Sequence, residues 1–157
     1  MVAILISGVK FISTKLKMPL PRRNYIRREE LFDKLDNIMD YKLTLVKGAA
    51  GSGKTTLLTS LVKDKALGYC RWISLDDDNN NMYSFWYYVT EAVKDYLGDA
   101  RENIQALFNT ILEKDDIERL LVVLINQLNT DAEILIVLDD FHCISDPYLI
   151  ETIEYFI

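Results

Sequence analysis

The residues best suited to chemistry lie in one glycine-rich stretch, KLTLVKGAAGSGKTTLL, from Lys42 to Leu58. Its spacing, Gly48-x-x-x-x-Gly53-Lys54-Thr55, is the P-loop pattern. Backbone N–H groups of such a loop curl around an anionic phosphate, and the helix after it directs its N-terminal N–H groups at the same point. Lys54 would reach the β- and γ-phosphates, and the Thr55 hydroxyl would ligate Mg²⁺. The predicted nucleotide-binding residues are Gly48, Ala49, Ala50, Gly51, Ser52, Gly53, Lys54, Thr55 and Thr56.

A second group of chemistry-bearing residues is acidic. In EILIVLDDFH, the apolar run from Ile134 to Leu138 ends in Asp139 and Asp140. The carboxyl ends of parallel strands meet at one edge of a sheet, so Asp139 should hold Mg²⁺ beside Thr55, directly or through water. Asp140 would orient or deprotonate an attacking water. The acidic pair alone is a weak signal, because strands often end at acidic turns, and its position after a P-loop strengthens it.

Strands and helices must position these groups. Leu43, Leu45 and Val46 predict a buried parallel strand over Tyr41–Lys47, and leucines at helical spacing predict a helix after Thr55. Two more strands are predicted over Tyr69–Leu75 and Ile134–Asp139. The other predicted helices are Arg28–Ile38, Ser84–Leu97, Glu102–Leu112, Asp116–Leu128 with Asp115 as its N-cap, and one that begins near Pro147.

Three other groups of residues have both a functional and a structural interpretation. Asp76–Asp78 could bind a metal ion, but a polar loop that caps the next helix is favoured. The aromatic run Phe85–Tyr88 is favoured as core packing over a base-stacking platform. The arginines around Arg28 could touch a nucleotide, although a solvated basic face is the commoner arrangement.

Composition limits the class of protein. The chain has 157 residues, 50% of them hydrophobic, which predicts one domain with a real core. Its net charge of −6 gives no general electrostatic footprint for nucleic acid. Cys70 and Cys143 lack metal-site spacing and are expected to be reduced thiols of a cytoplasmic protein, and the single histidine, His142, excludes a histidine-rich metal site.

The N-terminal stretch MVAILISGVKFI is apolar but short. It has neither a basic n-region nor a small-residue cleavage site, so a signal peptide is not expected. It is also shorter than the ~18 apolar residues of a spanning helix, so no membrane association is predicted. We expect residues 1–13 to form an extension that adds a strand or docks as a tail.

Several motifs, taken in their order, resemble a known family. They are TKL (Thr14–Leu16), RREEL (Arg27–Leu31), the P-loop stretch, WISLDDDNN (Trp72–Asn80) and LIVLDDFHCISDP (Leu135–Pro147). Together they resemble the N-terminal ATPase domain of LuxR-family signal-transduction ATPases of the maltose-activator type, in the STAND class. The resemblance implies a three-layer α/β P-loop NTPase fold with a parallel sheet over residues 14–157. It also implies a switch that binds ATP or ADP with Mg²⁺, self-associates in the ATP state and binds DNA through a C-terminal helix-turn-helix.

The family's functional positions can be transferred to this sequence. The resemblance implies phosphate and Mg²⁺ binding by Gly48–Thr56, metal and water roles for Asp139 and Asp140, and, less strongly, a nucleotide contact by Arg28. His142 occupies the family's histidine position without a physical reason for it. Sensor repeats and a helix-turn-helix are not seen in these residues. The strand that normally follows the acidic strand, and that carries a sensor of the γ-phosphate, is not seen either, so we expect the domain to be C-terminally incomplete.

The resemblance also implies a sheet order in which one further strand separates the P-loop strand from the acidic strand. Without that strand, two alternatives are open: the two strands pair directly, or Val2–Ser7 fills the gap. Two other functions stay open as well. One is a metabolic P-loop kinase, which would need an acceptor pocket and an arginine-bearing lid, and the other is a fragment that keeps the motifs without activity.

Overall fold

The structure is a computed structural model that describes residues 3–6, 9–20, 25–110, 114–129 and 133–157. Its strands are β1 (Ala3–Ile6), β2 (Val9–Ile12), β3 (Cys70–Ser74) and β4 (Leu135–Asp139). Its helices are α1 (Glu29–Lys34), α2 (Lys54–Asp64), α3 (Met82–Val93), α4 (Ala100–Thr110), α5 (Lys114–Leu128) and α6 (Pro147–Phe156). In this part of the chain, no helix has the length and apolar character that crossing a membrane requires.

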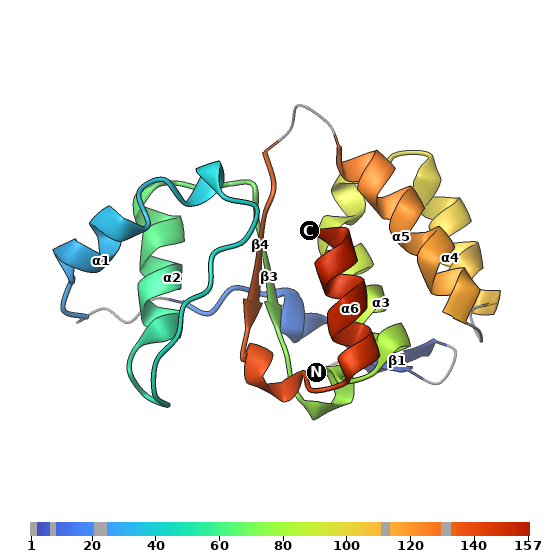
Figure 1. The fold of residues 1–157 in the computed structure, drawn as a ribbon, viewed down its shortest axis with the longest axis horizontal. Coiled ribbons are helices and arrows are strands. Elements are labelled where there is room, and N and C mark those ends of the chain that lie inside the picture. The colour runs from blue at the N-terminus through green and yellow to red at the C-terminus, as the bar shows by residue number, and fades with distance from the viewer. Residues whose placement is uncertain (1–2, 7–8, 21–24, 111–113, 130–132) are drawn as a thin grey trace.

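The centre of the fold is a parallel pair of strands, β3 and β4, in which Ser74 lies opposite Asp139. Helices α1 and α2 lie on one side of this pair and α3 to α6 on the other, which gives three layers (Figure 1). Side chains of β4 alternate between the layers: Leu135 packs toward α1 and α2, and Ile136 packs toward α3 to α6. The predicted α/β fold with a parallel sheet is therefore confirmed.

The larger core lies on the side of α3 to α6. The aromatic run Phe85–Tyr88 is 1–4% exposed, and the indole N–H of Trp86 donates a hydrogen bond to the Thr152 hydroxyl at 3.1 Å. The prediction that this run packs in the core is therefore correct. The smaller core, made by Phe32, Leu35, Ile38 and Leu61, joins α1 to α2.

The predicted strand Tyr41–Lys47 does not form. Residues 43–47 are irregular, and the side chains of Leu43 and Leu45 are 63% and 61% exposed. A strand requires a paired neighbour, and among the described residues β4 pairs only with β3, on one edge. The alternative in which the P-loop strand pairs directly with β4 is therefore wrong, and the expected sheet order with a further strand between them stays a prediction.

The N-terminal extension was expected either to add a strand or to dock as a tail, and it forms strands. However, β1 pairs antiparallel with β2, so the alternative in which Val2–Ser7 fills a gap in the central sheet is wrong. The hairpin is held on α3: the Tyr88 hydroxyl accepts a hydrogen bond from the Ile12 amide at 2.8 Å, and Phe11 packs edge-on against Tyr87.

Most helix boundaries differ from the prediction: α3 spans Met82–Val93 instead of Ser84–Leu97, and α4 begins at Ala100 instead of Glu102. Helix α1 ends at Lys34 instead of Ile38, because the chain then turns and forms a separate short 3₁₀ turn at Ile38–Asp40. Helix α5 begins at Lys114, so Asp115 lies inside the helix and is not its N-cap. Helix α6 begins at Pro147 as predicted, with the Asp146 carboxylate accepting a hydrogen bond from the Leu149 amide.

Candidate functional site

The glycine-rich loop has the backbone that its sequence predicts. Gly51 and Gly53 have φ of 74° and 90°, in the left-handed region that glycine adopts without a steric cost. A Cβ at Gly48 would lie 2.7 Å from the Ser52 hydroxyl oxygen, so any larger residue there would force the Ser52 side chain to rotate. The loop is closed by a hydrogen bond from the Ser52 amide to the Ala49 carbonyl, at 3.2 Å.

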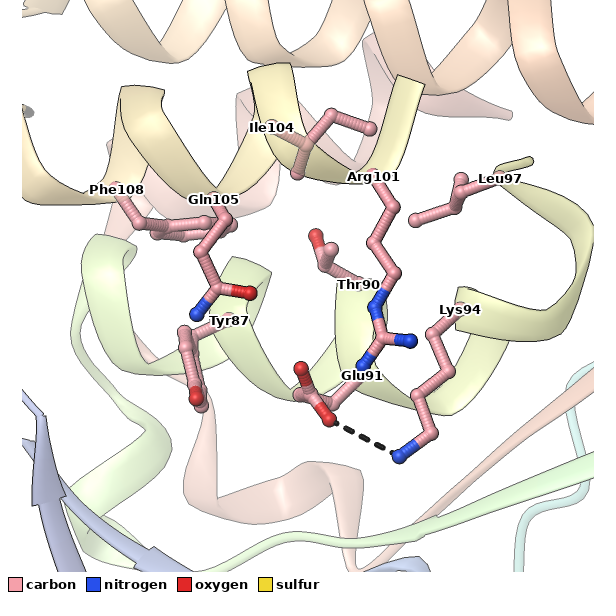
Figure 2. Close-up of a pocket in the computed structure, with 9 residues that line it drawn as sticks. All are labelled: Tyr87, Thr90, Glu91, Lys94, Leu97, Arg101, Ile104, Gln105 and Phe108. Atoms are coloured by element: carbon pink, nitrogen blue, oxygen red, sulfur yellow. Dashed lines mark hydrogen bonds and ion pairs between the residues drawn. The ribbon is translucent and has the colours of Figure 1, made fainter. Parts of the chain in front are cut away.

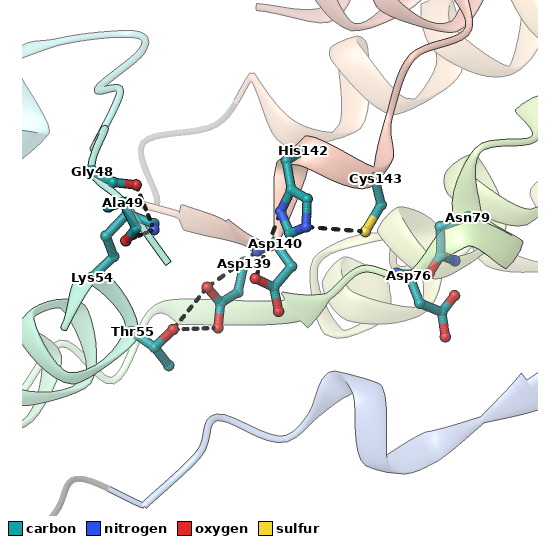
Figure 3. Close-up of polar contacts among 10 residues, drawn as sticks. All are labelled: Gly48, Ala49, Lys54, Thr55, Asp76, Asn79, Asp139, Asp140, His142 and Cys143. Carbon is teal, nitrogen blue, oxygen red and sulfur yellow. Dashed lines mark hydrogen bonds and ion pairs between the residues drawn. The ribbon is translucent and has the colours of Figure 1, made fainter. Parts of the chain in front are cut away.

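Helix α2 begins directly after this loop, with Gly53 as its N-cap. Its first turn therefore carries Lys54, Thr55 and Thr56, and its N-terminal N–H groups and positive dipole end face the loop. The Lys54 ammonium donates hydrogen bonds to the carbonyls of Gly48 at 2.9 Å and Ala49 at 3.1 Å (Figure 3). A cation and a helix N-terminus thus lie at one loop, an arrangement suited to a phosphate group.

The loop meets the acidic strand through one pair of side chains. The Thr55 hydroxyl lies 3.0 Å from both carboxylate oxygens of Asp139, at the carboxyl end of β4 (Figure 3). Oxygen ligands at about 2.1 Å on adjacent positions of an octahedral Mg²⁺ lie about 3 Å apart. The Thr55 hydroxyl oxygen and an Asp139 carboxylate oxygen therefore have the chemistry and the spacing of two Mg²⁺ ligands. A bound Mg²⁺ would supply positive charge against the phosphates.

Asp140 follows in an uncommon backbone conformation. Its φ of 58° and ψ of 37° are left-handed, which aspartate tolerates better than most residues. Its amide donates to the Asp139 carboxylate at 3.2 Å, and its own carboxylate lies 3.8 Å from Nδ1 of His142. The Asp140 side chain is 58% exposed, so its carboxylate is accessible to a water molecule.

Cys143 lies beside the same turn, with its Sγ 4.0 Å from Nε2 of His142 (Figure 3). Cysteine, histidine and aspartate in this order suggest an activated nucleophile. However, partial burial and the nearby carboxylates of Asp77 and Asp140 raise the pKa of the Cys143 thiol. A raised pKa keeps the thiol protonated at neutral pH, which argues against nucleophilic chemistry here.

The structure does not bring Arg28 to this site. Arg28 is exposed at the N-terminus of α1, and its neighbour Arg27 forms an ion pair with Asp64, the last residue of α2. Lys54 is the first residue of that helix, about 15 Å away at 1.5 Å per residue. A nucleotide contact by Arg28 stays a prediction.

The acidic run after β3 caps a short turn, as favoured. The Asp76 carboxylate accepts a hydrogen bond from the Asp78 amide at the start of the 3₁₀ turn Asp77–Asn79, and Asn81 caps α3. Nowhere in the described residues do three histidine, cysteine, aspartate or glutamate side chains gather as a metal site.

Sequence reasoning missed the contacts that Lys15, Asn79 and Asn80 make near the carboxyl ends of β3 and β4. Lys15 binds Asp76 and Asn79, and Asn80 binds the loop before α6. The motif TKL and the asparagine run after Asp78 were visible in the sequence, but nothing in the sequence showed that they meet.

A separate hollow lies between α3 and α4 (Figure 2). Its volume is about 10 Å³, and its lining includes Thr90, whose buried hydroxyl has no hydrogen-bond partner among the described residues. This volume fits about one water molecule. The hollow is therefore too small for a nucleotide and is not the functional site.

Comparison with known proteins agrees with this geometry. A family model described as "AAA domain" matches residues 38–156. The chain is 30% identical over 147 residues to the HTH-type transcriptional regulator MalT of Yersinia pestis, and 32% identical over 152 residues to MalT of Vibrio cholerae. These alignments cover 93% and 94% of this chain, which spans 16% of the length of each relative. The resemblance inferred from the motifs is confirmed.

Proposed function

The chain belongs to the AAA domain family, and from this premise we propose that it is a switch module that binds ATP or ADP with Mg²⁺ and hydrolyses ATP slowly. The observation that carries the proposal is the contact between the Thr55 hydroxyl and the Asp139 carboxylate. These residues are 84 positions apart in the chain, and they come from the two elements that a phosphate-bound metal ion must bridge.

Each residue of the site then has a distinct role. The amides of the loop from Gly48 to Gly53 and the start of α2 bind the phosphates, and Lys54 neutralises the charge on the β- and γ-phosphates. Thr55 and Asp139 hold the metal ion. Asp140 accepts a proton from the attacking water or orients it.

Slow hydrolysis follows from the position of Asp140. Its side chain is one methylene shorter than that of a glutamate, so its carboxylate reaches less far from the backbone toward the attacking water. A base must be within hydrogen-bond reach of the proton that it removes, about 3 Å. A long-lived ATP state is what a switch requires.

The role of the whole protein extends this proposal. The relatives are named transcriptional regulators of the HTH type, and this chain spans 16% of their length. We infer a cytoplasmic, STAND-class module of such a regulator. It would self-associate in the ATP state, and DNA would be bound by a part of the protein outside this chain. The metabolic kinase is supported less well, because the turn from Asp140 to Asp146 contains no arginine.

A nucleotide titration tests the proposal. Fluorescent ATP and ADP are titrated into the protein with Mg²⁺ and with EDTA. We expect both nucleotides to bind, and we expect Mg²⁺ to strengthen ATP binding in the wild type but much less in Thr55→Val and Asp139→Asn. Absence of saturable binding, or an equal Mg²⁺ effect in all three proteins, would contradict the proposed site.

A further inference from the structure

A single asparagine connects the loops that follow the two central strands. The Asn80 side-chain oxygen accepts hydrogen bonds from the amides of Ser145 and Asp146, both at 2.9 Å. Its side-chain nitrogen donates to the Ser145 hydroxyl at 3.0 Å. Asn80 therefore uses both ends of its amide on the segment that joins β4 to α6.

That segment carries the acidic residue of the proposed site. It is fixed at one end by Asp139, which contacts Thr55, and at the other end by Asn80. Between these two points lie Asp140, in its left-handed conformation, and the 3₁₀ turn Phe141–Cys143. The direction of the Asp140 carboxylate depends on how both ends of the turn are held.

The loop that carries Asn80 is itself anchored from two directions. Asn79 is fully buried, and its side chain donates to the Ser84 hydroxyl on α3 and accepts hydrogen bonds from the Asp76 amide and the Lys15 ammonium. The Lys15 ammonium also forms an ion pair with Asp76, and the Lys15 side chain is only 11% exposed.

The residue next to Asn80 shows that ordinary helix capping does not explain these bonds. Asn81 is the N-cap of α3, and its side-chain oxygen accepts a hydrogen bond from the Ser84 amide at 3.1 Å. Asn80 caps no part of α3, and the three hydrogen bonds that its side chain makes with described residues all cross to the other loop, 65 and 66 residues later.

Building on the proposed function, we propose that Asn80 is a positioning residue that sets the orientation of Asp140, and that Lys15 anchors the loop from which Asn80 acts. Asn80 does not touch the nucleotide loop. Removing the Asn80 side chain should therefore slow the cleavage of ATP and leave the phosphate-binding residues in place. The N-terminal TKL motif contributes to the same hydrogen-bond network, because its Lys15 contacts Asn79.

Adjacent asparagines provide matched variants. Asn80→Ala and Asn81→Ala remove the same atoms, but only the first releases the turn that carries Asp140. His142 is the only histidine of the chain and lies on this turn, so its ring C–H signals in an NMR spectrum report on the turn without any nucleotide. ATP cleavage in a single turnover and the affinity for fluorescent ADP are measured on the same proteins.

We expect Asn80→Ala to shift or broaden the His142 signals and to slow ATP cleavage about tenfold or more, because small misplacements of a reacting group are costly. Its ADP affinity should stay within about twofold of wild type, and Asn81→Ala should match wild type in all three measurements. Asn80→Asp keeps both acceptor bonds and should restore the His142 signals. Lys15→Met should change the signals in the same direction by a smaller amount.

Unchanged His142 signals in Asn80→Ala, or equal changes in Asn81→Ala, would overturn the proposal. If Asn80→Ala does not fold, Lys15→Met decides: altered His142 signals support the proposal and wild-type signals refute it. The NMR readout needs no nucleotide, so it still tests this positioning role if the protein binds no ATP or ADP.

Discussion

Replacing Lys54 by alanine tests the phosphate site most directly. In the structure the Lys54 ammonium makes two hydrogen bonds, at 2.9 and 3.1 Å, to carbonyls of its own loop. Hydrogen bonds to a charged group are typically worth about 1.5–3 kcal/mol, but these two are exposed to solvent, and exposed charge interactions are worth about 0–1 kcal/mol. We therefore expect Lys54→Ala to lower the free energy of unfolding by about 1 kcal/mol or less.

The effect on nucleotide binding should be larger than the effect on stability. The ammonium is the one basic group of the loop's own motif, and charge-assisted contacts to phosphate are among the stronger hydrogen bonds. We expect at least a tenfold loss of ATP affinity, or about 1.4 kcal/mol. The measurements are a fluorescent-ATP titration in Mg²⁺ and a thermal unfolding curve of the nucleotide-free protein.

Lys47→Ala is the matched control, because it removes the same charge from an exposed residue directly before Gly48. It should bind ATP within about twofold of wild type, since surface charges contribute little. The reasoning is refuted if Lys54→Ala and wild type bind ATP equally. It also fails if Lys47→Ala loses as much affinity as Lys54→Ala, because the effect would then be one of general charge.

Three further outcomes are expected. Wild-type ATP turnover should lie well below the ~1–100 s⁻¹ of kinases. Asp140→Asn should slow turnover further, because asparagine suits the left-handed backbone and the substitution removes only the charge. Robust multiple turnover by the wild type would contradict the proposed switch. Burial raises the pKa of Cys70 from 9.0 to about 11, so in Cys143→Ser the remaining thiol should react with iodoacetamide at pH 8 about a hundredfold more slowly than an ordinary thiol. The contribution of the protonated Cys70 thiol to the free energy of unfolding is complete below pH 9 and is lost as the pH rises toward 11. An ordinary reaction rate in the folded protein would refute the burial of Cys70. In hydrogen exchange of the monomer, amides of Leu135–Leu138 should be protected and those of Leu43–Val46 should exchange fast, whereas strong protection of both would show that the core closes around the P-loop segment.

The sequence by itself determined the parts of the site that depend on local backbone. The glycine spacing predicted the loop, because positive φ at Gly51 and Gly53 is a local property of those residues. Apolar runs predicted β3 and β4 to within one residue at each end. The carboxyl end of β4 then placed Asp139 where Thr55 meets it.

Only the tertiary structure decided which elements pair and which polar residues meet. Leu43–Val46 has the composition of a strand, but strand formation needs a hydrogen-bonded neighbour, which a local pattern does not supply. In the sequence, Lys15 and Asn80 stood out only as members of the motifs TKL and WISLDDDNN. Their roles come from contacts that span 61 to 66 residues, and side-chain hydrogen bonds at that separation are set by how helices pack on the sheet.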